Sequence, residues 1–279
     1  MFDPTLNVNL VVALMVEAKP FIDQFKLTPQ PEHRVFKIYS NSNVSLIISG
    51  MGRNNAAAAT AYLGAQFSSA NVVSLWINLG IAGHSSHSIG ELVIAHKILE
   101  RASGHAFYPL VYPVSLTSTE LVTVDVPETG YSEESAFDME ASGFAAVASK
   151  FTSLEFIQSV KVISDNAESG IAAVSKSSIE DLMRSSVTAV VQLIDVMLPS
   201  AVHRSAQIQL PQAFEQMLHT ARFSATQTVQ LKRLCQRYSA LGLEQQLTEI
   251  AGMEFESAKK IIQFLEAQLR LHIDIVQDS

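Results

Sequence analysis

Near-continuous apolar runs constrain the fold of this chain most. NLVVALMV at residues 9–16 and VVSLWINL at residues 72–79 lack the alternation of apolar and polar side chains that a half-exposed strand shows. A strand that is apolar on both faces needs helices to cover both faces of its sheet. Because helical stretches separate the strand-like runs, the pattern predicts an α/β fold on a largely parallel or mixed sheet.

The sequence changes character after residue 200. Residues 210–279 contain no strand-like run. Three amphipathic helical patterns appear instead, at residues 211–222, 225–241 and 254–276. We therefore expect an α/β domain over residues 1–200 and an all-helical appendage over residues 201–279.

Charge and cysteine content exclude several classes of partner. The chain has a formal net charge of −8 and no basic block, which argues against nucleic acid or an anionic membrane as the main partner. Its single cysteine, Cys235, cannot form a disulfide within the chain and is expected in a helical core. Asp3 stands where a signal peptide needs positive charge, and no apolar run has the length needed to cross a bilayer. We expect a cytoplasmic protein without a membrane partner.

Two glycine-containing segments follow predicted strands. SGMGRNNAAAA at residues 49–59 leads into an alanine-rich helix, so that backbone N–H groups near Gly50 and Arg53 can face an anion or a ligand hydroxyl. GIAG, which begins at Gly80, is predicted to be a second turn. Gly50, Arg53 and Gly80 are therefore candidate substrate-binding residues, although a tight turn without a ligand explains the first segment equally well.

Acidic side chains also follow predicted strands. Glu17 comes directly after residues 9–16, and Ser164 and Asp165 end the apolar run VKVI. The carboxyl ends of strands in such a sheet form the edge at which ligands bind, which makes these residues candidates for a site. The alternatives are a turn role for Asp165, and for Glu17 the role of an acid in the first turn of a helix.

A close pair of carboxylates occurs in FDMEASG at residues 137–143. Asp138 and Glu140 flank Met139, and a helix of small residues is predicted over residues 138–150. In a chain that is 48% hydrophobic, carboxylates at the edge of the core are caps or do chemistry. Asp138 fits a cap at the helix start, whereas Glu140 is either functional or a surface residue of the helix.

His84 and His87 have the spacing of a pair of metal ligands. The sequence offers no evident third ligand for them. We therefore expect a polar loop, and neither a metal nor an organic cofactor.

Five segments, in order, resemble the nucleoside phosphorylase and nucleosidase superfamily. They are VVALMVEAKPF, SGMGRNNAAAA, INLGIAGHSSHSIGELVI, FDMEASGFAAVA and VKVISDNAE. Within the superfamily, the chain is most similar to nucleosidases that act on methylthioadenosine and S-adenosylhomocysteine and to related bacterial phosphorylase-like proteins. The resemblance implies a three-layer α/β/α fold with a central mixed sheet. It also implies a homodimer and a small-molecule purine nucleoside as substrate.

The resemblance assigns a role to individual residues. Asp165 falls where relatives carry an aspartate that protonates or hydrogen-bonds the purine N7, with Ser164 beside it. Glu17 falls where an acid orients or deprotonates the attacking water. Glu140 falls where a glutamate binds the ribose hydroxyls, and Met139 where a methionine packs under the ribose.

The chain also departs from the family pattern. Val126 and Glu128 lie near the segment whose backbone contacts the purine in relatives, but Pro127 between them has no N–H to donate. Ile81 replaces a serine that helps to hold phosphate or the nucleophile in the family.

The chemistry of N-glycosidic bond cleavage suits three separated acids. Cleavage develops positive charge on the sugar and negative charge on the base, so one carboxyl group protonates the base and another activates water. A third accepts the ribose hydroxyls. Arg53 is the only arginine near a recognised motif, and a lone arginine is a poor cage for phosphate. We predict a purine nucleosidase that uses water. The alternatives are a phosphate-dependent purine nucleoside phosphorylase and an inactive nucleoside-binding or regulatory module.

Overall fold

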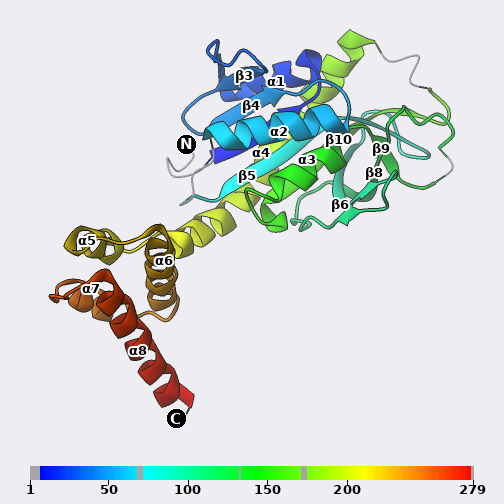
Figure 1. Cartoon of the computed structure of the whole chain (residues 1–279). Coiled ribbons are helices and arrows are strands. Elements are labelled where there is room, and N and C mark those ends of the chain that lie inside the picture. The colour runs from blue at the N-terminus through cyan, green and yellow to red at the C-terminus, as the bar shows by residue number, and fades with distance from the viewer. Residues whose placement is uncertain (1–6, 68–71, 132, 171–174, 278–279) are drawn as a thin grey trace. The chain divides into compact units, whose positions relative to one another are not determined.

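The computed structural model describes residues 7–67, 72–131, 133–170 and 175–277. The chain forms two compact units, Met1–Val202 and His203–Ser279. Each unit contains its own cluster of buried apolar side chains. The first unit is α/β and the second is all-helical (Figure 1).

The first unit is built on one mixed sheet. Its described strands are β1 (Asn7–Val12), β2 (Thr28–Pro29), β3 (Lys37–Ser40), β4 (Val44–Ile48), β5 (Ser74–His84), β6 (Leu92–Glu100), β7 (Ala106–Phe107), β8 (Thr117–Thr123), β9 (Ala136–Asp138) and β10 (Ile157–Asn166). Its described helices are α1 (Met15–Phe25), α2 (Arg53–Phe67), α3 (Ala141–Ala148), the short 3-10 helix η1 (Leu154–Phe156) and most of α4 (Lys176–Ile208). The strands follow the order β10-β6-β8-β9-β5-β1-β4-β3-β2, and β7 pairs with β6.

One end of this sheet closes on itself. β10 pairs in parallel with β5 and antiparallel with β6. β6 continues through β8 and β9 back to β5. The closed ring therefore contains β5, β10, β6, β8 and β9. The remaining strands extend from β1, which pairs in parallel with β5 and β4.

Helices cover both faces of the sheet. α2 and α3 lie in front of it in Figure 1, and α4 passes behind it. α1 lies next to α4, where Lys19 Nζ is 3.0 Å from a carboxylate oxygen of Glu180. An ideal Cβ on Gly143 would lie 2.0 Å from the carbonyl oxygen of Arg53, so α3 approaches the start of α2 only because residue 143 is glycine. The predicted three-layer architecture with a central mixed sheet is confirmed.

The prediction that GIAG forms a turn is wrong. β5 continues through this segment to His84. Gly80 pairs with Lys161 of β10, and Gly83 pairs with Asp165. Glycine in a strand also marks a place where other groups approach the backbone closely. Here these groups are Glu17 and Lys161 at Gly80, and Asp165 and Tyr131 at Gly83.

The prediction of one helix over residues 138–150 is also wrong in its first part. Asp138 is the last residue of β9 and pairs with Thr123 of β8, and α3 begins only at Ala141. Met139 and Glu140 therefore lie at a strand-to-helix junction, with Glu140 buried.

The expectation that no segment has the length needed to cross a bilayer does not hold for one described helix. Lys176–Ala206 of α4 is long and apolar enough by length and composition. About 33% of its apolar window is buried, including Met183, Val190, Leu193 and Ile194, so this part of the helix contributes to the core.

The second unit is a small helical bundle. Beyond the end of α4 it contains α5 (Gln212–Thr220), α6 (Ala225–Ala240), α7 (Glu244–Ala251) and α8 (Ala258–Gln277). The predicted helical appendage is confirmed, although the short helix α7 was not expected. Cys235 is buried in the core of this unit, as predicted, beside residues such as Leu231 and Leu265.

Candidate active site

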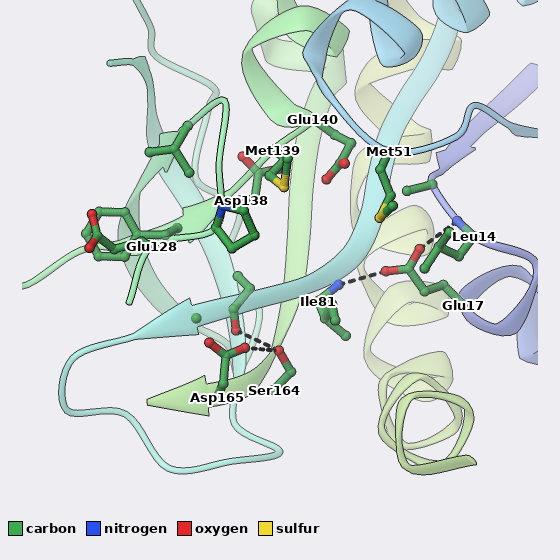
Figure 2. A pocket seen from close by; sticks show the side chains of 16 residues that line it. Leu14, Glu17, Met51, Ile81, Glu128, Asp138, Met139, Glu140, Ser164 and Asp165 are labelled. Carbon is green, nitrogen blue, oxygen red and sulfur yellow. Dashed lines mark hydrogen bonds between the residues drawn. The ribbon is translucent and has the colours of Figure 1, made fainter. Parts of the chain in front are cut away.

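A cavity of about 150 Å³ lies over the region where β5, β9 and β10 meet the start of α1 (Figure 2). Its lining is rich in acids: five carboxylate side chains face it, from Glu17, Glu128, Asp138, Glu140 and Asp165. Among the described residues that line it, none is an arginine, lysine or histidine. A cavity with this lining favours a cation, or a group that becomes positive during a reaction.

Glu17 is held in the first turn of α1 by backbone groups. The N–H of Leu14 donates to Oε2 at 2.8 Å, and the N–H of Ile81 in β5 donates to Oε1 at 3.2 Å (Figure 2). The side chain is almost completely buried. Burial raises the pKa of Glu17 from 4.5 to about 7, even though nearby Lys161 acts in the opposite direction. The carboxyl group can therefore take up and release a proton near neutral pH.

Glu140 is positioned by the first glycine segment. The N–H of Gly52, at the start of α2, donates to Oε1 of Glu140 at 2.8 Å. The anion that faces this helix N-terminus is thus a side chain of the protein itself. Burial raises the pKa of Glu140, which Lys161 partly offsets. The backbone of Met139 also hydrogen-bonds this carboxylate, and Glu140 lines the cavity.

Lys161 of β10 was not anticipated as part of the site. Its Nζ lies 2.8 Å from Oδ2 of Asp138, and both side chains are shielded from solvent. Burial alone would lower the pKa of Lys161, but Asp138, Glu140 and Glu17 together raise it. A lysine within the apolar run VKVI of a strand buried on both faces is the signal that points to such a pair.

Asp138 is bound from several sides. Its Oδ1 accepts a hydrogen bond from Thr123 Oγ1 at 2.8 Å, and its Oδ2 accepts one from the N–H of Ala141 at 2.8 Å. The second bond caps the start of α3, which agrees with the cap role expected for Asp138. The residue is buried rather than solvated because Lys161 compensates its charge.

Asp165 accepts hydrogen bonds from two hydroxyl groups. Ser164 Oγ donates to Oδ1 at 2.5 Å, and the hydroxyl of Tyr131 donates to Oδ2. Ser164 and Asp165 both line the cavity. Tyr131 comes from the segment between β8 and β9, and nothing in the sequence pattern marked it.

The other candidate residues divide into two groups. Met139 and Ile81 line the cavity, as do the five carboxylates. Gly50, Arg53, Gly80 and Val126 do not line it.

Each residue of the second group has a structural reason for its place. The N–H of Gly50 donates to the carbonyl of Ala13 at 3.0 Å. Gly80 leaves room for the side chains of Glu17 and Lys161, since an ideal Cβ there would lie 3.0 Å from Oε1 of Glu17 and 3.4 Å from Nζ of Lys161. Val126 is 72% exposed, and Pro127 and Glu128 line the cavity in its place.

Arg53 has carboxylate partners of its own. Its Nε lies 2.7 Å from Oδ1 of Asp125, and its Nη1 is paired with Glu100. The guanidinium is therefore committed to two acids outside the cavity lining.

The two histidines were expected in a polar loop, but His84 is the last residue of β5 and only His87 lies in the segment that follows it. His84 is buried, and its Nδ1 accepts the N–H groups of Ser86 and His87 at 3.1 and 3.2 Å. Burial and the nearby His87 lower the pKa of His84 to about 4. In the part of the chain that the structure describes, no group of three potential ligands is arranged to hold a metal ion.

Comparisons with known proteins identify the fold. No model of a protein family matches this chain, and no curated protein matches it. Solved structures do. The 5′-methylthioadenosine nucleosidase of Arabidopsis thaliana is 15% identical, with a TM-score of 0.59, and the match covers 70% of this chain and 97% of that chain.

Two bacterial proteins match equally completely. The 5′-methylthioadenosine/S-adenosylhomocysteine nucleosidase of S. pneumoniae, solved with a transition-state inhibitor, is 18% identical, with a TM-score of 0.54, and the match covers 68% of this chain and 99% of that chain. The futalosine hydrolase of Helicobacter pylori is 16% identical, with a TM-score of 0.54 and coverage of 68% and 98%. The chain thus has the fold of nucleoside phosphorylases and nucleosidases, as the resemblance implied.

Proposed function

We propose that this chain hydrolyses the N-glycosidic bond of a purine nucleoside and releases the free base. The observation that carries the proposal is the convergence of Glu17, Glu140 and Asp165 on one cavity from three separate segments (Figure 2). The reaction needs a base for water, an anchor for the sugar and an acid for the leaving group, and these three carboxyl groups supply one each.

The steps follow from the positions of the three groups. A water oxygen forms a bond to the anomeric carbon of the sugar while the bond to the base nitrogen breaks. Glu17 takes the proton that the water loses, and its pKa of about 7 suits this task near neutral pH. Asp165 gives a proton to the base. Glu140 accepts the ribose hydroxyls, and its negative charge steadies the sugar as it becomes cationic.

The charge of the cavity favours water over phosphate. A phosphate ion would have to enter a space whose described lining contains several carboxyl groups and no arginine, lysine or histidine. Arg53, the residue considered for phosphate, is paired with Asp125 and Glu100. A phosphate-dependent phosphorylase is therefore the weaker alternative.

The purine part of the proposal draws support from proteins with the same fold. The nucleosidases named above act on adenine nucleosides by their names, and a related nucleosidase of Colwellia psychrerythraea, 18% identical with a TM-score of 0.54, was solved in complex with adenine. The predicted homodimer and cytoplasmic location stay predictions. Light scattering on the purified protein tests the first.

The test is a product assay over a panel of adenine and guanine nucleosides, with and without phosphate. We expect free base to appear without phosphate, and Asp165→Asn to lower the rate by about 100-fold or more. Asp23→Asn, an exposed aspartate near the end of α1, is the matched control and should keep full activity. Release that requires phosphate would select the phosphorylase. Binding of a nucleoside in calorimetry without any release would select the binding module.

A further inference from the structure

We propose that Tyr131 is a positioning residue for Asp165. The hydroxyl of Tyr131 stabilises the negative charge that Asp165 acquires when it passes its proton to the leaving base. The inference rests on the proposed function and adds to it a residue outside the cavity lining. Four features of the described structure carry it: the contact itself, the space made for it, the way the Tyr131 segment is held, and the protonation of the tyrosine.

The contact joins the tyrosine hydroxyl to the carboxylate oxygen that Ser164 leaves open. Tyr131 donates to Oδ2 of Asp165, whereas Ser164 donates to Oδ1. Tyr131 is not among the residues that line the cavity, so it reaches Asp165 without occupying the place of the base. A carboxylate oxygen can accept more than one hydrogen bond, and Asp165 therefore keeps capacity for a ligand.

Gly83 makes room for this contact. An ideal Cβ on Gly83 would lie 2.7 Å from Oδ2 of Asp165 and 2.9 Å from Cε1 of the Tyr131 ring. Any larger residue at position 83 would push the two side chains apart. The last glycine of GIAG thus has a specific use, although it is in a strand and not in a turn.

The segment that carries Tyr131 is held in place. Tyr131 has a φ of 44°, a left-handed conformation that is strained for an aromatic residue and persists only when its surroundings enforce it. Arg101 ties this segment to the sheet, with hydrogen bonds of 2.8 Å to Glu128 and 2.9 Å to Glu133. The ring itself is buried beside Val122, Val124 and Phe137.

The protonation state of Tyr131 fits a donor. Burial and the hydrogen bond to Asp165 raise the pKa of Tyr131 well above its ordinary value, so the hydroxyl keeps its proton. When the proton of Asp165 moves to the base nitrogen, the base becomes neutral and Asp165 becomes a carboxylate. Two O–H donors then face that carboxylate, and hydrogen bonds of this kind stabilise the charged form.

The experiment compares two leaving groups in Tyr131→Phe. A purine needs a proton to leave, whereas the p-nitrophenolate of p-nitrophenyl β-D-riboside leaves without one. We expect kcat for the purine nucleoside to fall about tenfold or more, and kcat for p-nitrophenyl riboside to change by less than about twofold. Tyr62→Phe, which removes a partly buried hydroxyl bonded to His33 at 3.2 Å, is the matched control and should change neither rate.

A double variant tests whether Tyr131 acts through Asp165. In the Asp165→Asn background, Tyr131→Phe should cause no further loss, because the carboxylate it serves is absent. An equal loss on both substrates, or a further loss in the Asp165→Asn background, overturns the inference alone. A wild-type protein that releases neither leaving group overturns the proposed function, and the inference with it. Thermal unfolding of each variant separates these effects from misfolding.

Discussion

The ammonium of Lys161 lies 2.8 Å from Oδ2 of Asp138, and both side chains are almost completely buried. Thr123 and the N–H of Ala141 complete the hydrogen bonding of the aspartate. The positive charge of Lys161 also acts on Glu17 and Glu140, the two carboxyl groups proposed to serve water and ribose. The pair therefore has two effects: it neutralises a buried charge in the sheet, and its lysine lowers the pKa values of Glu17 and Glu140 in the cavity.

Removal of one partner of this pair should be costly. Lys161→Met leaves Asp138 buried without a counter-charge, and we expect the free energy of unfolding to fall by about 3–5 kcal/mol. Lys19→Met, which breaks the exposed pair with Glu180, should leave the free energy of unfolding nearly unchanged. Urea unfolding measures both. The double variant Lys161→Met with Asp138→Asn should recover part of the loss, and a fully additive loss would contradict the pairing.

The pH dependence of activity should report Glu17. The proposed water activation needs the ionised carboxylate, and burial places the pKa of Glu17 at about 7. We expect kcat/KM to fall about tenfold for each pH unit below that value. A profile that stays flat from about pH 5 to about pH 8 would remove Glu17 from the role of base. Glu17→Gln should have low activity throughout.

The same shift predicts how stability depends on pH. The unfolded chain releases the Glu17 proton near the ordinary pKa of 4.5, and the folded protein releases it near a pKa of about 7. Between these values the folded state binds a proton that the unfolded state does not, so stability falls as pH rises through this window. The loss amounts to about 3 kcal/mol and is complete above about pH 7. Urea unfolding of Glu17→Gln should lack this decrease, and an equal decrease in the variant would exclude Glu17 as its source.

Much of the fold followed from the sequence because burial leaves a direct pattern. The apolar runs that contain Leu10 and Ile77 became central strands, and the amphipathic patterns after residue 200 became helices. Local turn chemistry was less informative at GIAG. Glycine marks a close approach as well as a turn, and the approaching side chains come from distant parts of the chain, which a single sequence does not reveal.

The residues of the site also fall into those that the sequence pattern marked and those that it did not. Glu17 and Asp165 stood out because acids at the ends of apolar strands need an explanation, and Glu140 stood out as one of a close pair of carboxylates in FDMEASG. Tyr131 did not stand out, because its contact with Asp165 spans 34 residues and depends on a left-handed backbone that no local motif predicts. Lys161 could have been noticed, since a lysine inside a buried strand requires a buried acid.

Glu140 should determine the preference for ribose. Its Oε1 is bound to the N–H of Gly52 at 2.8 Å, which orients the carboxylate toward the cavity. Loss of charge-assisted hydrogen bonds in Glu140→Gln should lower kcat/KM for a ribonucleoside by about 10- to 100-fold. The wild type should also prefer a ribonucleoside over its 2′,3′-dideoxy analogue, and Glu140→Gln should lose most of that preference. A variant that keeps the full preference would show that the ribose hydroxyls bind elsewhere.

Arg53 provides the test that separates water from phosphate. If its guanidinium serves Asp125 and Glu100 and not a phosphate ion, Arg53→Met should leave base release independent of added phosphate. Its cost in stability should be about 1 kcal/mol, because the pair with Asp125 is partly exposed. The measurement is the rate of base release as phosphate is titrated into the wild type and the variant. Stimulation of the wild type by phosphate that disappears in Arg53→Met would identify Arg53 as a phosphate ligand. Asp125→Asn is the control, because it frees Arg53 from one partner without removing the guanidinium. Glu100 still pairs with Arg53 in this variant, so its rate of base release should also not depend on phosphate.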